Sequence, residues 1–152
     1  MSENSKKFDQ LPDNWLSNYV DDGFAKDKPN FENVEIDLEK RVIKATVGFK
    51  SFYENAQGFH LSVLTAYRIA VQLINAYLCA HYDTDKITLG TTTAISQSMD
   101  CRKPINTQSF EVEAICKKLV ERDSVVYGHF DYDFGNGAFV GYVRGRVGKP
   151  KK

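Results

Sequence analysis

The sequence predicts an α+β domain in which a curved antiparallel sheet wraps around one long central helix. Two observations predict this fold class. From Leu61 to His81, apolar residues lie almost all the way around a helical wheel, which is typical of a fully buried helix. The segments on either side alternate apolar and polar residues with a period of two, which is typical of half-buried strands. Because such a helix must be covered, and only a curved sheet in this chain can cover it, the helix belongs inside the sheet.

Two strands are predicted before the helix and four after it. A turn over residues 39–41 separates the first two, and Gly135-Asn136-Gly137 predicts a tight hairpin, since Asn-Gly supplies the positive φ angles that such a turn needs. The positions that define the strands are Val34, Ile36 and Leu38; residues 42–49; Leu89, Thr91, Thr93, Ile95, Gln97 and Met99; Phe110, Val112, Ala114 and Cys116; Val126, Gly128, Phe130, Tyr132 and Phe134; and Phe139, Gly141, Val143, Gly145 and Val147.

The N-terminal region does not follow the strand pattern. Residues 1–10 are polar and expected to fray, and a short helix around Trp15 is expected after a cap at Asp13 or Asn14. The predicted organisation is an N-terminal arm and short helix over 1–30, a domain over 31–148 and a basic tail over 149–152. A curved sheet around one helix is the hotdog fold. Because a lone hotdog leaves strand edges exposed, we expect a homo-oligomer, either a dimer or a dimer of dimers.

Composition narrows the class of protein. The chain has 152 residues, the size of one domain, and its 20 basic residues balance its 20 acidic ones, which argues against a nucleic-acid binder. Three cysteines without metal-type spacing predict no disulfide framework, no metal site and no cofactor. Arg68, Gln72 and Asn75 interrupt the most apolar stretch, and the N-terminus lacks a signal-peptide core. We expect a cytoplasmic protein that does not bind membranes.

Three blocks resemble the FcoT-like thioesterases. The first is Cys101–Phe110 (CRKPINTQSF), the second is Ser51–His60 (SFYENAQGFH), and the third is the closing hairpin Asp133–Ala138 (DFGNGA). The resemblance extends over about residues 15–147. It departs from the family at one point, because the family has Gly-His-Phe where this chain has Gly58-Phe59-His60.

The resemblance implies a hotdog enzyme that acts on fatty acyl thioesters carried by coenzyme A or acyl carrier protein. Some family members are implicated in isonitrile lipopeptide pathways, where they are thought to add glycine to an α,β-unsaturated acyl thioester and to release the β-amino acid. We therefore expect a thioesterase-type hydrolase, with conjugate addition as a further activity in secondary-metabolite biosynthesis. The alternatives are a hotdog dehydratase or hydratase, a non-catalytic acyl-binding hotdog, and a different fold, such as a cone-shaped α+β ligand-binding domain.

The predicted central helix carries no acid. Between Glu54 and Asp83 there is no Asp or Glu, whereas many hotdog thioesterases and dehydratases use a helix carboxylate to activate water or move a proton. Without a helix acid, catalysis would depend on electrostatic stabilisation of the thioester carbonyl. Gly58, Phe59 and His60 stand where the helix is introduced, and unpaired backbone N–H groups there would polarise a thioester carbonyl. Such a hole serves hydrolysis and conjugate addition equally; alternatively, Gly58 only shapes a turn.

Side chains near that point complete the candidate catalytic group. Tyr53 matches a family Tyr and could hydrogen-bond the thioester oxygen or orient the nucleophile, or it could serve packing alone. His60 would suit a general base at neutral pH, or it could be a capping residue. Tyr19 could close over the site as a lid. His81 and His129 receive no role.

Substrate-binding candidates lie further along the chain. Tyr67 and Asn75, with Arg68 and Gln72, are polar residues on an otherwise apolar helix; they either line a wet pocket or form a buried network or dimer contact. Further cationic residues could hold the phosphates of an acyl carrier, or they could simply form the solvated face of strands. These are Arg102 and Lys103, which belong to the best-matched block, with Lys117, Lys118, Arg144 and Arg146.

Overall fold

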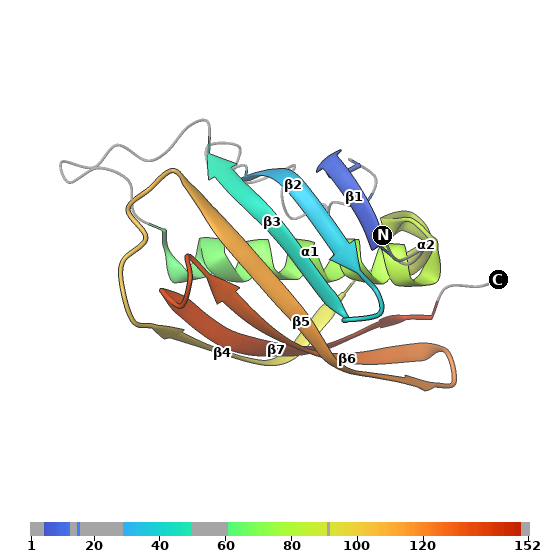
Figure 1. Ribbon diagram of the computed structural model, residues 1–152. Helices are drawn as coiled ribbons and strands as arrows, with labels where there is room; N and C mark the ends of the chain where they lie inside the picture. The colour runs from blue at the N-terminus through green and yellow to red at the C-terminus, as the bar shows by residue number, and fades with distance from the viewer. Residues whose placement is uncertain (1–4, 13–14, 16–28, 50–60, 91, 150–152) are drawn as a thin grey trace.

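The computed structural model describes residues 5–12, 15, 29–49, 61–90 and 92–149. One antiparallel sheet has the strand order β1-β2-β3-β5-β6-β7-β4 and curves over the long helix α1 (Figure 1). This confirms the predicted sheet around a central helix. The elements are β1 (Ser5–Gln10), β2 (Pro29–Asp37), β3 (Val42–Phe49), α1 (Val63–Tyr82), α2 (Lys86–Leu89), β4 (Thr93–Cys101), β5 (Ser109–Arg122), β6 (Val125–Phe134) and β7 (Phe139–Gly148).

The hydrophobic core lies between α1 and the inner face of the sheet. In β3, β5, β6 and β7 the buried positions follow the predicted alternation, and Phe110, Phe130 and Phe134 are among the aromatic side chains that fill the core. The prediction is wrong for β4, where Thr93, Ile95 and Gln97 are exposed. α1 is long and apolar enough to cross a membrane by length and composition, but 72% of its most apolar window is buried in the fold. Its apolarity therefore reflects its place inside the sheet.

The ends of α1 are set by local hydrogen bonds. Ser62 is the N-cap, and its side chain accepts a hydrogen bond from the Thr65 N–H at 3.1 Å. At the other end Asp83 adopts a left-handed conformation with φ 49°, and its N–H donates to the Cys79 carbonyl. Just before the helix, the Leu61 N–H donates to the Ile105 carbonyl at 2.9 Å. This bond ties the start of α1 to the segment that joins β4 to β5.

The structure corrects the prediction that residues 1–10 fray. Residues 5–10 form the edge strand β1, which pairs with β2 so that Phe8 lies opposite Val34. The Phe8 ring packs edge-on against Trp15, with centroids 5.1 Å apart. Pairing with β2 and this aromatic contact hold the segment in the sheet. Its sequence is polar and lacks the alternation that predicts a strand. The predicted cap at Asp13 or Asn14 lies outside the described residues.

The strand predicted from Leu89 begins later. Asp85 caps the short helix α2 by accepting a hydrogen bond from the Thr88 N–H at 2.8 Å, and Gly90 ends it with φ 78°. Leu89 is buried and anchors this helical turn to the core. β4 starts at Thr93 and forms the sheet edge beside β7. A local turn signal thus overrode the alternating pattern.

The hairpin between β6 and β7 has the predicted turn. Gly135, Asn136 and Gly137 have φ angles of 60°, 53° and 83°, and the Gly137 N–H donates to Asp133 Oδ1 at 2.6 Å. Only residues that tolerate the left-handed region fit this connection.

Candidate functional site

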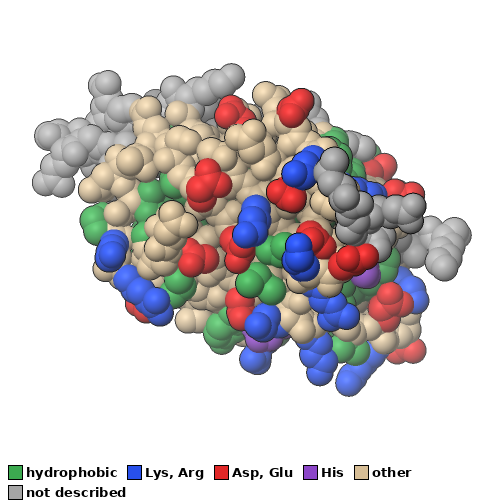
Figure 2. Space-filling view, in the orientation of Figure 1, with side chains coloured by type: hydrophobic (Ala, Val, Ile, Leu, Met, Phe, Trp, Pro, Cys, Tyr) green, Lys and Arg blue, Asp and Glu red, His purple; other side chains and the backbone are tan. Residues whose placement is uncertain are grey.

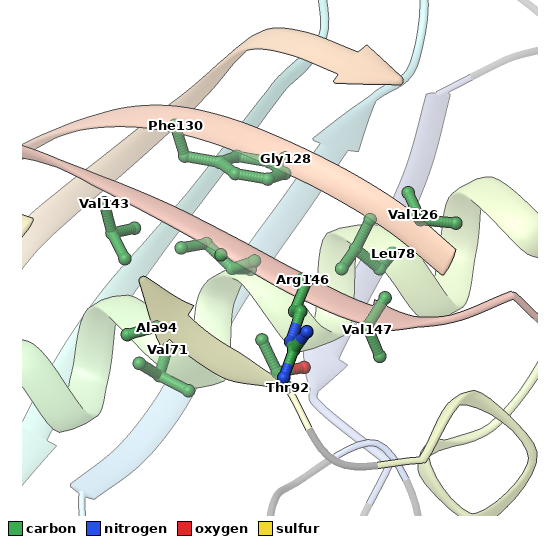
Figure 3. Close-up of a pocket in the computed structure, with 12 residues that line it drawn as sticks. Val71, Leu78, Thr92, Ala94, Val126, Gly128, Phe130, Val143, Arg146 and Val147 are labelled. Carbon is green, nitrogen blue, oxygen red and sulfur yellow. The ribbon is translucent and has the colours of Figure 1, made fainter. Parts of the chain in front are cut away.

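An apolar cavity of about 20 Å³ lies between α1 and the inner face of β6 and β7 (Figure 3). Such a volume is enough for about one water molecule. Val71, Ile74 and Leu78 line it from α1, one to two helical turns apart. The strands contribute Val126, Phe130, Val143 and Val147, and Thr92 and Ala94 close the side towards β4.

Two paired inward positions that line the cavity lack side chains. Gly128 on β6 and Gly145 on β7 lie directly opposite each other and both line it. The Phe130 ring reaches over Gly128: a Cβ built on Gly128 would stand 2.8 Å from Phe130 Cε2. Phe130 also packs edge-on against Tyr77, with centroids 5.5 Å apart. The ring of Phe130 therefore occupies space that the glycine leaves open.

A buried hydrogen bond links α1 to the start of β4 beside the cavity. Asn75 is 5% exposed, and its Oδ1 accepts a hydrogen bond from Thr92 Oγ1. Gln72, one turn earlier on α1, is also buried. This bond satisfies a polar group that would otherwise weaken an apolar helix interior. Asn75 thus ties α1 to the segment before β4, next to the cavity wall, and its predicted role in substrate binding stays a prediction.

A second polar group lies beside the N-terminal half of α1. The buried Tyr132 on β6 donates its O–H to the Ser98 carbonyl of β4 and also shares a hydrogen bond with Tyr67 of α1. Burial raises the pKa of Tyr132, and the neighbouring Tyr67 raises it further. The phenol of Tyr132 therefore stays protonated and acts as a hydrogen-bond donor. The next residue on α1, Arg68, has its Nε and Nη2 atoms enclosed. A cation and two phenols therefore flank this end of the helix.

The two buried thiols of the chain offer little nucleophilic chemistry. Burial raises the pKa of Cys79 to about 12 and raises that of Cys116, so both stay protonated. Cys101 is exposed at the end of β4. Within the described parts of the chain, no group of three His, Cys, Asp or Glu side chains could hold a metal ion.

Comparison with known proteins bears on the fold. No family model matches the chain, and no curated protein matches it by sequence. Solved structures do match. A mutant thioesterase, PA1618 from Pseudomonas aeruginosa, superposes with a TM-score of 0.59 at 13% identity, over 93% of this chain and 97% of that one. A hypothetical thioesterase from Streptococcus pneumoniae, solved with coenzyme A, gives 0.55 at 10% identity, over 86% and 94% of the two chains. The thioesterase HI1161 from Haemophilus influenzae gives 0.52 at 12%, over 87% of each.

This chain has the hotdog fold. At these identities the likeness establishes the architecture alone. In this hotdog, α1 is the central helix and β4, the first strand after it, is an edge strand of the sheet. β4 exposes most of its side chains, Ile95 at 59% among them.

The segment with the best-matched sequence block joins β4 to β5 in this hotdog. Arg102 and Lys103 are exposed, and their N–H groups donate to the Ala138 carbonyl at 2.8 and 3.2 Å. Arg102 Nε also lies 2.8 Å from Asp100 Oδ2. The Ile105 side chain lies against Gly135 of the hairpin. Two of the three blocks that resemble the FcoT-like family therefore meet in space, beside the start of α1.

Five sequence candidates lie outside the described residues: Tyr19, Tyr53, Gly58, Phe59 and His60. Of the rest, Tyr67 and Asn75 flank the interior from α1, whereas Arg102 and Lys103 lie at its N-terminal end. Sequence reasoning missed the Gly128 and Phe130 pair. The available signal was a glycine at an inward position of an otherwise apolar strand, which marks open space or a close approach.

Proposed function

We propose that this protein is an acyl-thioester enzyme that hydrolyses or otherwise processes a fatty acyl group carried by coenzyme A or acyl carrier protein. The observation that carries the proposal is the apolar cavity beneath the sheet, in a fold shared with proteins described as thioesterases. An alkyl chain is the ligand chemistry that this lining favours. The neighbour solved with coenzyme A supports that carrier.

The cavity holds an acyl chain only if the Phe130 ring moves. Its present volume of about 20 Å³ is far smaller than an alkyl chain, and the ring fills the space above Gly128. Rotation of the ring away from Gly128 would extend the cavity along β6 towards Val126. The position of one aromatic side chain would then set how much chain fits.

Hydrolysis in this site would depend on electrostatic stabilisation. A water oxygen attacks the thioester carbonyl carbon, and negative charge develops on the carbonyl oxygen. The C–S bond then breaks, and the leaving thiolate takes up the proton that the water loses. Residues 55–82 contain no carboxylate that could activate the water, so the proposed catalysis depends on hydrogen-bond donors that stabilise the oxygen. The backbone at Gly58, Phe59 and His60, with the Tyr53 phenol, is our proposed set.

The finer assignment is to the FcoT-like type. It is supported by the three sequence blocks, two of which meet beside the start of α1. In glycine addition, the amine attacks the β-carbon of an α,β-unsaturated thioester, and the same donors stabilise the resulting enolate, whose α-carbon takes up the proton that the amine loses. Release of the β-amino acid by hydrolysis would follow at the same carbonyl.

A non-catalytic acyl-binding protein is the second candidate. The absence of any Asp or Glu over residues 55–82 favours it, and the same absence disfavours a dehydratase that pairs His with an acid. In either case we propose a cytoplasmic homodimer or dimer of dimers. Two features support assembly: β4 lies at the edge of the described sheet, and Leu64 on α1 is 77% exposed.

The test is a mass-spectrometric product assay of the full chain. Crotonyl-CoA and longer acyl-CoAs are incubated with and without glycine, and free acid and glycine adducts are quantified. Tyr53→Phe removes one hydroxyl at the proposed site. Tyr82→Phe is the matched control, because Tyr82 lies at the far end of α1 and donates to Glu121 Oε1 at 2.9 Å.

Each outcome of this assay assigns the activity. Free acid that Tyr53→Phe abolishes and Tyr82→Phe leaves in place supports the hydrolase, and a glycine adduct supports conjugate addition. Reversible hydration of crotonyl-CoA would reassign the protein as a hydratase. A folded oligomer that turns over no acyl-CoA or acyl carrier protein thioester contradicts the enzyme and leaves the acyl-binding protein.

A further inference from the structure

A row of basic side chains crosses three neighbouring strands on the outer face of the sheet, away from α1. Lys118 on β5 pairs with His129 on β6, which pairs with Arg144 on β7. A bulge between Cys116 and Lys118 shifts the alternation of β5 and puts Lys118 on this face. Lys118 and Arg144 are cationic side chains, and the imidazole of His129 lies between them in the register of the sheet. Such a concentration of positive charge on one face favours a negatively charged ligand.

The row borders a groove of about 480 Å³, within the range of small-molecule sites. Lys118, Arg122 and Arg144 line it, and the backbone of Gly128 and Gly145 contributes to it. None of the described residues that line it is acidic. Blue side chains gather along the lower edge of the molecule in Figure 2, where β5, β6 and β7 lie in Figure 1.

In this basic groove, the guanidinium of Arg144 lies over the ring of Tyr142, 5.2 Å from its centroid. Among the described carboxylates, none lies within ion-pair distance of Lys118, Arg122 or Arg144. The nearby Asp131 is shared between Lys117 Nζ at 3.8 Å and His129 Nε2 at 3.3 Å. Because the whole chain has zero formal net charge, this cationic cluster is a local concentration. Arginine and lysine at such a density favour phosphate groups.

The basic groove also offers a surface for a flat ring. The side chain of Tyr127 lines it and is 38% exposed, and Ile95 from the bulge of β4 is 59% exposed beside it. An aromatic ring stacked on a nucleobase is a sequence-tolerant contact that needs only a π-face. Cationic and aromatic features in one groove match a nucleotide better than a bare anion.

We propose that the basic groove binds a nucleotide carrying at least two phosphate charges. Lys118, Arg122 and Arg144 hold the phosphates, and the base lies against Tyr127 and Ile95. Two sources share this chemistry, the nucleotide end of an acyl-CoA and a free nucleotide. Gly128 and Gly145 line both this groove and the apolar cavity on the other face of the sheet, so the two sites lie back to back. Nucleotide binding requires no turnover, so this inference stands apart from the proposed function.

The test is calorimetric titration of the full chain with adenosine 3′,5′-bisphosphate, with adenosine as the uncharged probe. We expect saturable binding of the bisphosphate that weakens with added salt, and none of adenosine. Because a hydrogen bond to a charged group contributes about 1.5–3 kcal/mol, Arg144→Gln and Lys118→Gln should each raise Kd about tenfold or more. Lys44→Gln is the matched control, since Lys44 lies in the same sheet but pairs with Glu113 at 2.6 Å.

Two results would support the nucleotide site, and they distinguish the nucleotide end of an acyl-CoA from a free nucleotide as its ligand. If Arg144→Gln also raises the KM for acyl-CoA and leaves kcat unchanged, the groove holds the nucleotide end of the substrate. If the KM stays the same while bisphosphate binding is lost, the ligand is a free nucleotide. Absence of saturable bisphosphate binding overturns the proposal, as does a Kd that Arg144→Gln and Lys118→Gln leave unchanged. Either failure is independent of whether acyl-CoA is turned over.

Discussion

Replacing Phe130 by alanine should open the cavity beneath the sheet at a large cost in stability. Phe130 is 2% exposed and packs against Tyr77 and over Gly128. Truncation of a buried phenylalanine to alanine costs about 3–5 kcal/mol, a large share of the roughly 5–15 kcal/mol that holds a domain folded. Phe130→Leu keeps most of the volume and should cost about 1 kcal/mol. Urea unfolding measures both as changes in the free energy of unfolding.

A double-mutant cycle tests whether the ring covers the glycine. In the natural protein, Gly128→Ala forces a methyl to 2.8 Å from Phe130 Cε2, an overpacking that costs about 1–3 kcal/mol. In the Phe130→Ala background that contact is gone and the methyl fills part of the hole, so the same change should be nearly neutral. The coupling free energy between Phe130→Ala and Gly128→Ala should then be about 1–3 kcal/mol. In the control cycle, the effects of Phe110→Ala and Gly128→Ala should be nearly additive. Additivity within about 0.5 kcal/mol for the Phe130 pair would refute the geometry.

Three further predictions follow from polar contacts. Asn75→Ala removes the acceptor of the Thr92 hydroxyl and should lower the free energy of unfolding by about 1–3 kcal/mol, whereas the exposed change Asn106→Ala should leave urea unfolding unchanged. Tyr132→Phe removes the bond to the Ser98 carbonyl and should cost about 0.5–1.5 kcal/mol, with hydrogen exchange accelerated in β4; unchanged β4 protection would contradict it. Hydrogen bonds from Lys149, the larger cause, and from Tyr82 hold the pKa of Glu121 below its usual 4.5. The contribution of Glu121 to folding stability is therefore present above pH 4.5 and is lost as the pH falls through its pKa in the folded protein. Glu121→Gln should flatten stability between pH 5 and its acid limit, and an unchanged pH profile would count against this pair of bonds.

Most of the fold could be predicted because burial imposes a period on the sequence. β3 and the first half of β5 bury every second residue, and the buried residues of β6 and β7 all lie at alternate positions. Because α1 is apolar on nearly every side, the sequence pattern alone identifies these elements. β1 and α2 escaped prediction because they depend on partners and caps: Phe8 gains its contact from Trp15, and Leu89 is positioned by the Asp85 cap. Such contacts leave no period in the sequence.

The candidate site was less accessible from the sequence. The polar residues Tyr67 and Asn75 were identified because they break an apolar helix. The cavity itself depends on which strand positions face each other, and the pairing of Gly128 with Gly145 follows from register. The Lys118, His129 and Arg144 row depends likewise on a bulge in β5. Cross-strand neighbours of this kind require the fold before they can be assigned.

Photoaffinity labelling with a fatty acyl-CoA that carries a diazirine in its acyl chain tests the central claim most directly. Labelled peptides are identified by mass spectrometry, with unlabelled acyl-CoA as competitor. We expect labels that unlabelled acyl-CoA displaces, within the cavity-lining segments 71–78 of α1 or 126–130 of β6. Labels confined to the outer face of the sheet, or labels that unlabelled acyl-CoA does not displace, would contradict an acyl site between α1 and the sheet.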